Sequence, residues 1–124
     1  KKGDYNMINR VVVIGRLVGD PELKITQAGI SYVRVTIANE QAYKDKKHTN
    51  FIDVLAWSGL AENLSKYCDK GRKILIDGRL EVKKNTKGDK NYTNVTVIAE
   101  NIDFLEAAKS SQTFEVIENA EAPF

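Results

Sequence analysis

The chain has 124 residues, of which 42% are hydrophobic and 29% are charged, and this composition is that of a single soluble globular domain. No apolar run approaches the roughly 18 residues of a membrane span, and no signal-peptide segment opens the chain, so we expect a cytoplasmic protein that does not enter a membrane. The one cysteine, Cys68, has no internal disulfide partner and is interpreted as a small buried apolar residue.

The formal net charge of +2 hides an uneven distribution. Residues 106–124 hold four glutamates and one lysine, which leaves 18 basic and 13 acidic side chains in the first 105 residues. A basic body with an acidic end is typical of a polyanion-binding domain that carries an interaction tail.

The chain opens with residues 1–6, which are polar and precede Met7. We interpret them as an appended remnant and take the domain as residues 7–105. A β-branched run over 8–17 predicts a buried strand with a bulge or bend at Gly15. Turns are expected at residues 20–21 and 28–29.

Alternation of apolar and polar residues predicts two further strands, over 31–38 and 51–57. Between them, residues 39–50 are polar and basic, and we expect a long loop or a flexible hairpin end. In the 51–57 strand the outward positions are Phe51, Asp53, Leu55 and Trp57. Large apolar groups on an open face are unusual, so this face is a candidate binding surface.

Helical spacing of apolar residues follows Gly59 and predicts one short helix that ends near Gly71. A fourth strand is expected over 74–80, a basic loop over 83–91 and a fifth strand over 92–99. Residues 101–105 could add a short final strand.

This order of elements predicts an all-β fold, a closed five-stranded Greek-key barrel with one short helix between strands 3 and 4. The oligonucleotide/oligosaccharide-binding (OB) fold has this order. A β-sandwich is less consistent with the sequence, because there are few strands and the helix would have no role.

The last ten residues form an acidic run that closes on Pro123 and Phe124. An aromatic ring beside a terminal carboxylate suits a basic, apolar pocket on another protein. A frayed chain end is the alternative reading.

Several spaced segments together resemble the bacterial and phage single-stranded DNA-binding proteins. They are residues 9–17, 20–22, 51–57, 60–62, 70–71 and 76–80, and the acidic end that closes on Pro123 and Phe124. The resemblance implies an OB barrel, assembled as a homotetramer, that binds and protects single-stranded DNA with little sequence preference in a bacterial cell or a phage-infected host. It also implies a tail over 106–124 that recruits replication, recombination and repair proteins through Glu118, Glu121, Pro123 and Phe124.

Binding a single strand without reading its sequence requires flat rings for the bases and cations for the phosphates. The candidate stacking residues are Trp57, Phe51, Tyr43 and Tyr92. The candidate phosphate contacts are Arg10, Arg16, Arg34, Lys44, Lys46, Lys47, Arg72, Lys73, Arg79, Lys83, Lys84, Lys87 and Lys90. The clusters at 44–47 and 83–90 are the stronger candidates, since they would form flexible basic arms.

The chain departs from the family pattern at two places. Asn85 stands where the family often has an aromatic residue, so one stacking platform is missing. The linker over 107–113 is short, which favours a phage or plasmid member.

Catalysis has little support in the sequence. His48 is the only histidine, which leaves no zinc site and no histidine-centred triad. Asp53, Asp77 and Asp103 lie on separate predicted strands and are interpreted as surface carboxylates. We therefore expect neither a metal nor a cofactor, and a protein that is not an enzyme. Two other functions stay open, a protein-interaction adaptor in which the tail is the working part, and an RNA-binding barrel.

Overall fold

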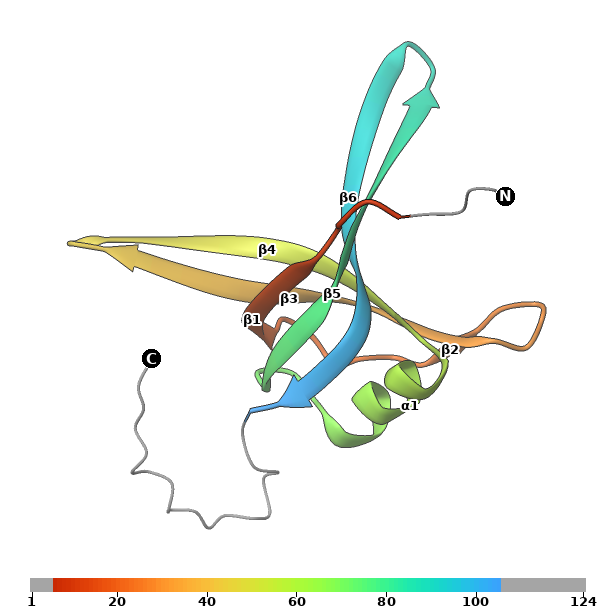
Figure 1. Ribbon diagram of the computed structural model, residues 1–124, viewed down its shortest axis with the longest axis horizontal. Coiled ribbons are helices and arrows are strands. Elements are labelled where there is room, and N and C mark those ends of the chain that lie inside the picture. Colours follow the sequence, from red (N-terminus) through yellow and green to blue (C-terminus); the bar gives the residue numbers. More distant parts are fainter. Residues whose placement is uncertain (1–5, 106–124) are drawn as a thin grey trace.

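The computed structural model describes residues 6–105, and the expected tail, including Glu118, Glu121, Pro123 and Phe124, lies outside them. In chain order the described elements are β1 (Val11–Leu17), β2 (Lys24–Ile25), β3 (Ser31–Tyr43), β4 (Lys46–Trp57), α1 (Ser58–Tyr67), β5 (Lys73–Lys87) and β6 (Lys90–Phe104). The strands follow the order β1-β5-β6-β4-β3-β2, and β1 also pairs with β3 at Arg16 and Leu17. That last pairing closes the five long strands into a barrel, as expected, with the helix between the third and fourth of them (Figure 1).

The barrel interior is filled by the inward-facing residues of the alternating strands. Val33, Ile37, Val54, Ile74 and Ile76 are fully buried. The alternation that predicts β3 and β4 therefore also predicts which residues form the core.

Helix α1 covers one end of the barrel (Figure 1). It buries Ala61 and Leu64, and the backbone amide of Cys68 donates a hydrogen bond to the Leu64 carbonyl at 3.1 Å. Cys68 is buried as expected, and this burial raises the pKa of its thiol. Tyr67, at the end of α1, is exposed, and its ring centroid lies 6.4 Å from that of Phe104.

The irregularity expected at Gly15 occurs elsewhere. β1 pairs with β5 without a shift from Val11 to Arg16, whereas the register of β5 against β6 shifts between Asp77 and Gly78. Gly78 lies against the backbone of Ile98, where an added Cβ would collide with the carbonyl. β6 continues through this bulge to Phe104, so residues 101–104 extend β6 and do not form a separate strand.

Two long β-hairpins end in residues 39–50, where a long loop or a flexible hairpin end is expected, and in residues 83–91, where a basic loop is expected. β3 pairs with β4 from Tyr32–Trp57 out to Tyr43–Lys46, and β5 pairs with β6 out to Lys87–Lys90. Each hairpin turns through a left-handed residue, Lys44 with φ 55° and Gly88 with φ 64°. We call residues 39–50 the first arm and residues 82–95 the second arm. Figure 1 shows the two arms leaving the barrel in different directions.

Among residues 6–105, no helix is both long enough and apolar enough to cross a membrane.

Candidate nucleic-acid interface

A groove of about 520 Å³ runs over the outer face of the barrel, at the base of the second arm. It is lined by side chains from four strands, namely Arg34, Asp53, Leu55, Trp57, Arg79, Glu81, Lys83, Asn85, Asn94, Thr96 and Ile98. We refer to this surface as the groove.

Strand register explains how these side chains meet. Arg34 on β3 pairs with Leu55 on β4, Leu55 pairs with Ile98 on β6, and Ile98 pairs with Arg79 on β5. The four residues therefore form one row across the sheet. Since neighbouring strands are separated by about 4.8 Å, the two arginine backbones are separated by about 14 Å along the curved sheet.

The middle of this row is the apolar floor of the groove. Leu55 and Ile98 are each only 6% exposed, although they are outward-facing positions. Both line the groove in the middle of the row, between Arg34 and Arg79. An apolar floor between two cations suits a nucleotide, because its base can lie on the apolar surface while its phosphate contacts a cation.

Trp57 stands at the end of the groove, where β4 meets α1, and is 39% exposed. Its register partner on β3 is Tyr32, and the two ring centroids are 5.5 Å apart. Tyr32 is not among the stacking residues predicted from the sequence. Extending the alternation of β3 from Arg34 back by two residues would have placed Tyr32 on the same outer face.

The other predicted stacking residues are distributed along the surface. Phe51 is 68% exposed on the outer face of β4, six residues from Trp57 or about 20 Å along the strand. Tyr43 is exposed near the tip of the first arm, with Lys44 Nζ 5.4 Å from its ring centroid. Tyr92 lies opposite Asn85 on the second arm and lines a hollow that continues from the groove.

The predicted cations fall into separate groups. Arg34, Arg79 and Lys83 line the groove. Lys84 follows Lys83 and, by strand alternation, points to the opposite face of the second arm. Lys44, Lys46 and Lys47 lie at the tip of the first arm, and Lys87 and Lys90 lie at the tip of the second.

The remaining predicted cations lie away from the groove. Arg16 and Lys73 are register partners and line a hollow with Ala38, which is the register partner of Phe51. Arg10 pairs with Asp77 at 2.7 Å. Arg72 lies just before β5, where its carbonyl accepts a hydrogen bond from the Leu17 amide at 3.0 Å.

The groove also contains two carboxylates, Asp53 and Glu81. Asp53 is expected from the sequence to be a surface carboxylate, and Glu81 is not among the predicted site residues. Glu81 lies 3.8 Å from Lys83. Asp53 accepts a hydrogen bond from Thr36 Oγ1 at 2.9 Å. Among residues 6–105, no group of three or more histidine, cysteine, aspartate or glutamate side chains could hold a metal ion.

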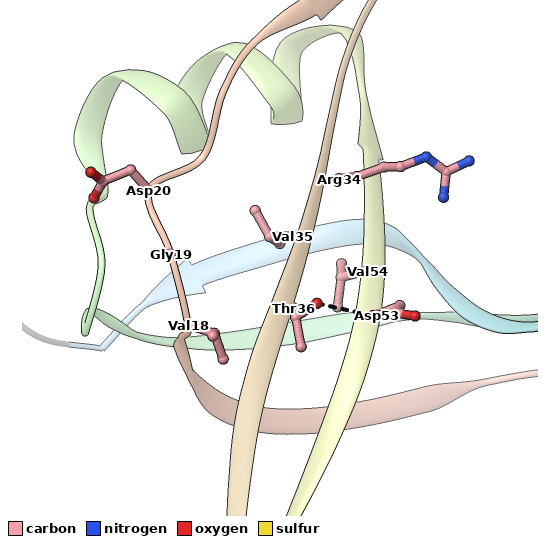
Figure 2. Close-up of a pocket in the computed structure, with 8 residues that line it drawn as sticks. All are labelled: Val18, Gly19, Asp20, Arg34, Val35, Thr36, Asp53 and Val54. Atoms are coloured by element: carbon pink, nitrogen blue, oxygen red, sulfur yellow. Dashed lines mark hydrogen bonds between the residues drawn. The ribbon is translucent and has the colours of Figure 1, made fainter.

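Beside the groove is a second hollow of about 420 Å³, under the connection that leaves β1 (Figure 2). It is lined by Val18, Gly19, Asp20, Arg34, Val35, Thr36, Asp53 and Val54. Arg34 and Asp53 line both hollows and so form the boundary between them.

Comparison with known proteins agrees with this geometry. Residues 8–105 match the Single-strand binding protein family. The single-stranded DNA-binding protein of Fusobacterium nucleatum is 40% identical over 113 residues, which cover 87% of this chain and 73% of that protein. Single-stranded DNA-binding protein 1 of Staphylococcus aureus is 36% identical over 112 residues, 86% of this chain and 71% of that protein.

A solved structure of Plasmodium falciparum SSB in complex with ssDNA has a similar fold, with a TM-score of 0.75 at 20% identity. The match covers 83% of this chain and 99% of that chain. The family match spans most of the described barrel. It confirms the resemblance to single-stranded DNA-binding proteins seen in the sequence. The chain belongs to the Single-strand binding protein family.

Proposed function

We propose that this protein binds single-stranded DNA with little sequence preference, and that the groove is the centre of the binding surface. The observation that carries this proposal is the row of Arg34, Leu55, Ile98 and Arg79, with Trp57 beside it. Bases would rest on the apolar floor and the indole, while cationic side chains around the groove contact phosphates. The names of the two bacterial relatives support this function.

Stacking would supply much of the affinity. Each base that stacks on an aromatic ring contributes about 1 to 3 kcal/mol, as measured by alanine substitution. Trp57 in the groove and Phe51 farther along β4 are the main platforms, and Tyr43 and Tyr92 on the two arms are additional ones. All four rings are exposed and therefore accessible to bases.

Phosphate contacts would extend from the groove onto both arms. The lysines at the arm tips are exposed, and within residues 6–105 only Lys47 among them has an ion pair, a weak one with Nζ 3.9 Å from Glu40 Oε1. Exposed cations on projecting hairpins can follow a backbone without fixing its sequence. Arg16 and Lys73 would contact the phosphates of a DNA strand that passes over Phe51.

We further propose that the protein assembles as a homotetramer. Within residues 6–105, β1 pairs with β5 from Val11 to Arg16 but with β3 only at Arg16 and Leu17, so most of its second edge has no strand partner. Val12 and Ile14 on β1 are exposed apolar residues. An open edge with an apolar face is a surface on which a second copy can pair.

The acidic end is proposed as the recruiting segment for replication, recombination and repair proteins. In this division, residues 7–105 bind DNA, and residues 106–124 are a linker and a tip that carries Glu118, Glu121, Pro123 and Phe124. The charge asymmetry adds a hypothesis, that the tip competes with DNA for the basic body when no partner is present. Deleting residues 106–124 should then raise affinity for DNA at low salt, and unaltered affinity would remove this hypothesis.

The direct test is a titration of labelled oligo-dT, oligo-U and duplex DNA by fluorescence anisotropy. We expect oligo-dT to bind more tightly than the duplex, with a log–log salt slope of about 0.7 for each phosphate contact. Equal or tighter binding of oligo-U would indicate an RNA-binding protein. Absence of oligo-dT binding would overturn the proposal and favour the adaptor function, for which deletion of Pro123 and Phe124 should abolish capture of partner proteins.

A further inference from the structure

We propose that the groove contains one subsite that prefers guanine, formed by Asp53 and Arg34. This inference rests on the proposed function and adds to it a local base preference. A protein that binds any single strand would then still hold a guanine more tightly than other bases at one position.

The positions of the two residues follow from register. Arg34 lies opposite Leu55, and Thr36 lies opposite Asp53, on adjacent outward rows of β3 and β4. Arg34 and Asp53 are therefore diagonal neighbours, whose Cβ atoms are separated by about 7 Å. Figure 2 shows both side chains extending to the same side of β4.

The carboxylate has a fixed orientation. Thr36 Oγ1 donates to Asp53 Oδ1 at 2.9 Å, which restrains the side chain and leaves Oδ2 to accept from a ligand. Within the described residues, Asp53 has no cationic partner, and Arg34 makes no hydrogen bond or ion pair. Opposite charges thus line the same groove without forming an ion pair with each other.

A carboxylate in a phosphate-binding groove opposes binding of the DNA backbone, because like charges repel. Asp53 is better suited to contact a base, since a carboxylate accepts from N–H donors on base edges. Leu55, which lies directly opposite Arg34 and two residues from Asp53 on the same face of β4, provides apolar surface beside both charged groups.

Guanine has the edge that matches both groups. Its N1–H and N2–H₂ are adjacent donors for a carboxylate, and its O6 and N7 are acceptors for a guanidinium. Thymine offers a single N3–H donor between two carbonyl oxygens, so it fits the Asp53 carboxylate less well. A guanine in this subsite would therefore satisfy two charges that are unpartnered in the protein.

The experiment uses the full chain and the shortest oligo-dT that it binds, with one dG placed at each position in turn. Affinity is measured by competition against a fluorescein-labelled oligo-dT. At one position we expect the oligonucleotide with dG to bind at least about fivefold more tightly than the oligonucleotide with dT there. Deoxyinosine, which lacks the N2 amino group, should lose part of that gain at the same position.

Substitutions assign the effect to the carboxylate. Asp53→Asn keeps an acceptor for Thr36 but removes the charge, and we expect it to abolish the dG preference while slightly tightening binding of oligo-dT. Asp103→Asn removes the same charge from exposed β6 outside the groove and should leave the preference intact.

Equal affinity for dG and dT at every position, with oligo-dT still bound, would overturn the guanine subsite and leave the proposed function in place. Tighter binding of dA or dC than of dG, or a dG preference that survives in Asp53→Asn, would overturn it as well. If oligo-dT itself does not bind, both the subsite and the proposed function fail.

Discussion

The rings of Tyr32 and Trp57 lie 5.5 Å apart between centroids, at an angle of 43°, on directly paired positions of β3 and β4. This pairing holds the indole at the end of the groove, where Trp57 is also the residue before the first turn of α1. A tilted aromatic contact fixes one face of the indole against its neighbour and leaves the other available. Tyr32 is therefore a positioning residue for the proposed stacking platform.

Replacing Tyr32 with leucine should weaken binding of oligo-dT by about 0.5 to 1.5 kcal/mol, the contribution of an aromatic pair beyond its buried area. Tyr32→Phe keeps the ring and should bind like the unaltered protein. Anisotropy titrations of both variants check this. If Tyr32→Phe loses as much affinity as Tyr32→Leu, the hydroxyl and not the ring pair is responsible.

Phe51 should contribute to binding although it lies outside the groove. Phe51→Ala removes an exposed ring and should reduce affinity for longer oligo-dT by about 1 to 3 kcal/mol, because one base loses its stacking partner. Tyr67→Ala is the matched control, since it removes an exposed ring at the end of α1. A comparable loss in both variants would show that the effect of Phe51 is not local.

The lysines at the tip of the second arm should act through phosphates. In the double variant Lys87→Gln, Lys90→Gln, the log–log salt slope should fall by up to about 1.4, since each contact adds about 0.7. Lys66→Gln on α1 provides a control with one positive charge removed elsewhere. If the slope of the double variant, measured between low and physiological salt, is unaltered, the two lysines do not contact phosphates and the second arm is not part of the binding surface.

Gly78 should be required for the stability of the barrel. A methyl group there would meet the backbone of Ile98, and crowding of this kind destabilises proteins by about 1 to 3 kcal/mol. Urea unfolding of Gly78→Ala measures the change. Gly19→Ala is the control, because nothing lies within 4 Å of its added Cβ. Equal stability of the two variants would show that the bulge adapts freely.

The sequence predicts the barrel well because its core strands alternate strictly. Val33 and Ile37 on β3 and Val54 on β4 are buried where the period-2 pattern places them. The length of the arms is not predicted, although a hairpin end is one of the two expectations for residues 39–50, because residues 39–50 and 82–95 have few buried side chains and their structure depends on backbone pairing. The bulge at Gly78 is also missed, since it depends on how closely β5 and β6 approach.

For the candidate site, the sequence identifies Trp57 and Phe51 as outward aromatic residues, and both are exposed. It does not identify the row that joins Arg34 to Arg79, because this row depends on the parallel pairing of β4 with β6. Residues 55 and 98 are neighbours only through that register. The roles of the predicted DNA contacts remain predictions for the measurements above.

The central claim, that bases rest on Trp57 in the groove, is tested most directly by tryptophan fluorescence, since the chain has a single tryptophan. Saturating oligo-dT should quench this emission strongly, and Trp57→Ala should lose about 1 to 3 kcal/mol of affinity. Full binding with unchanged emission, together with undiminished affinity of Trp57→Ala, would contradict the account.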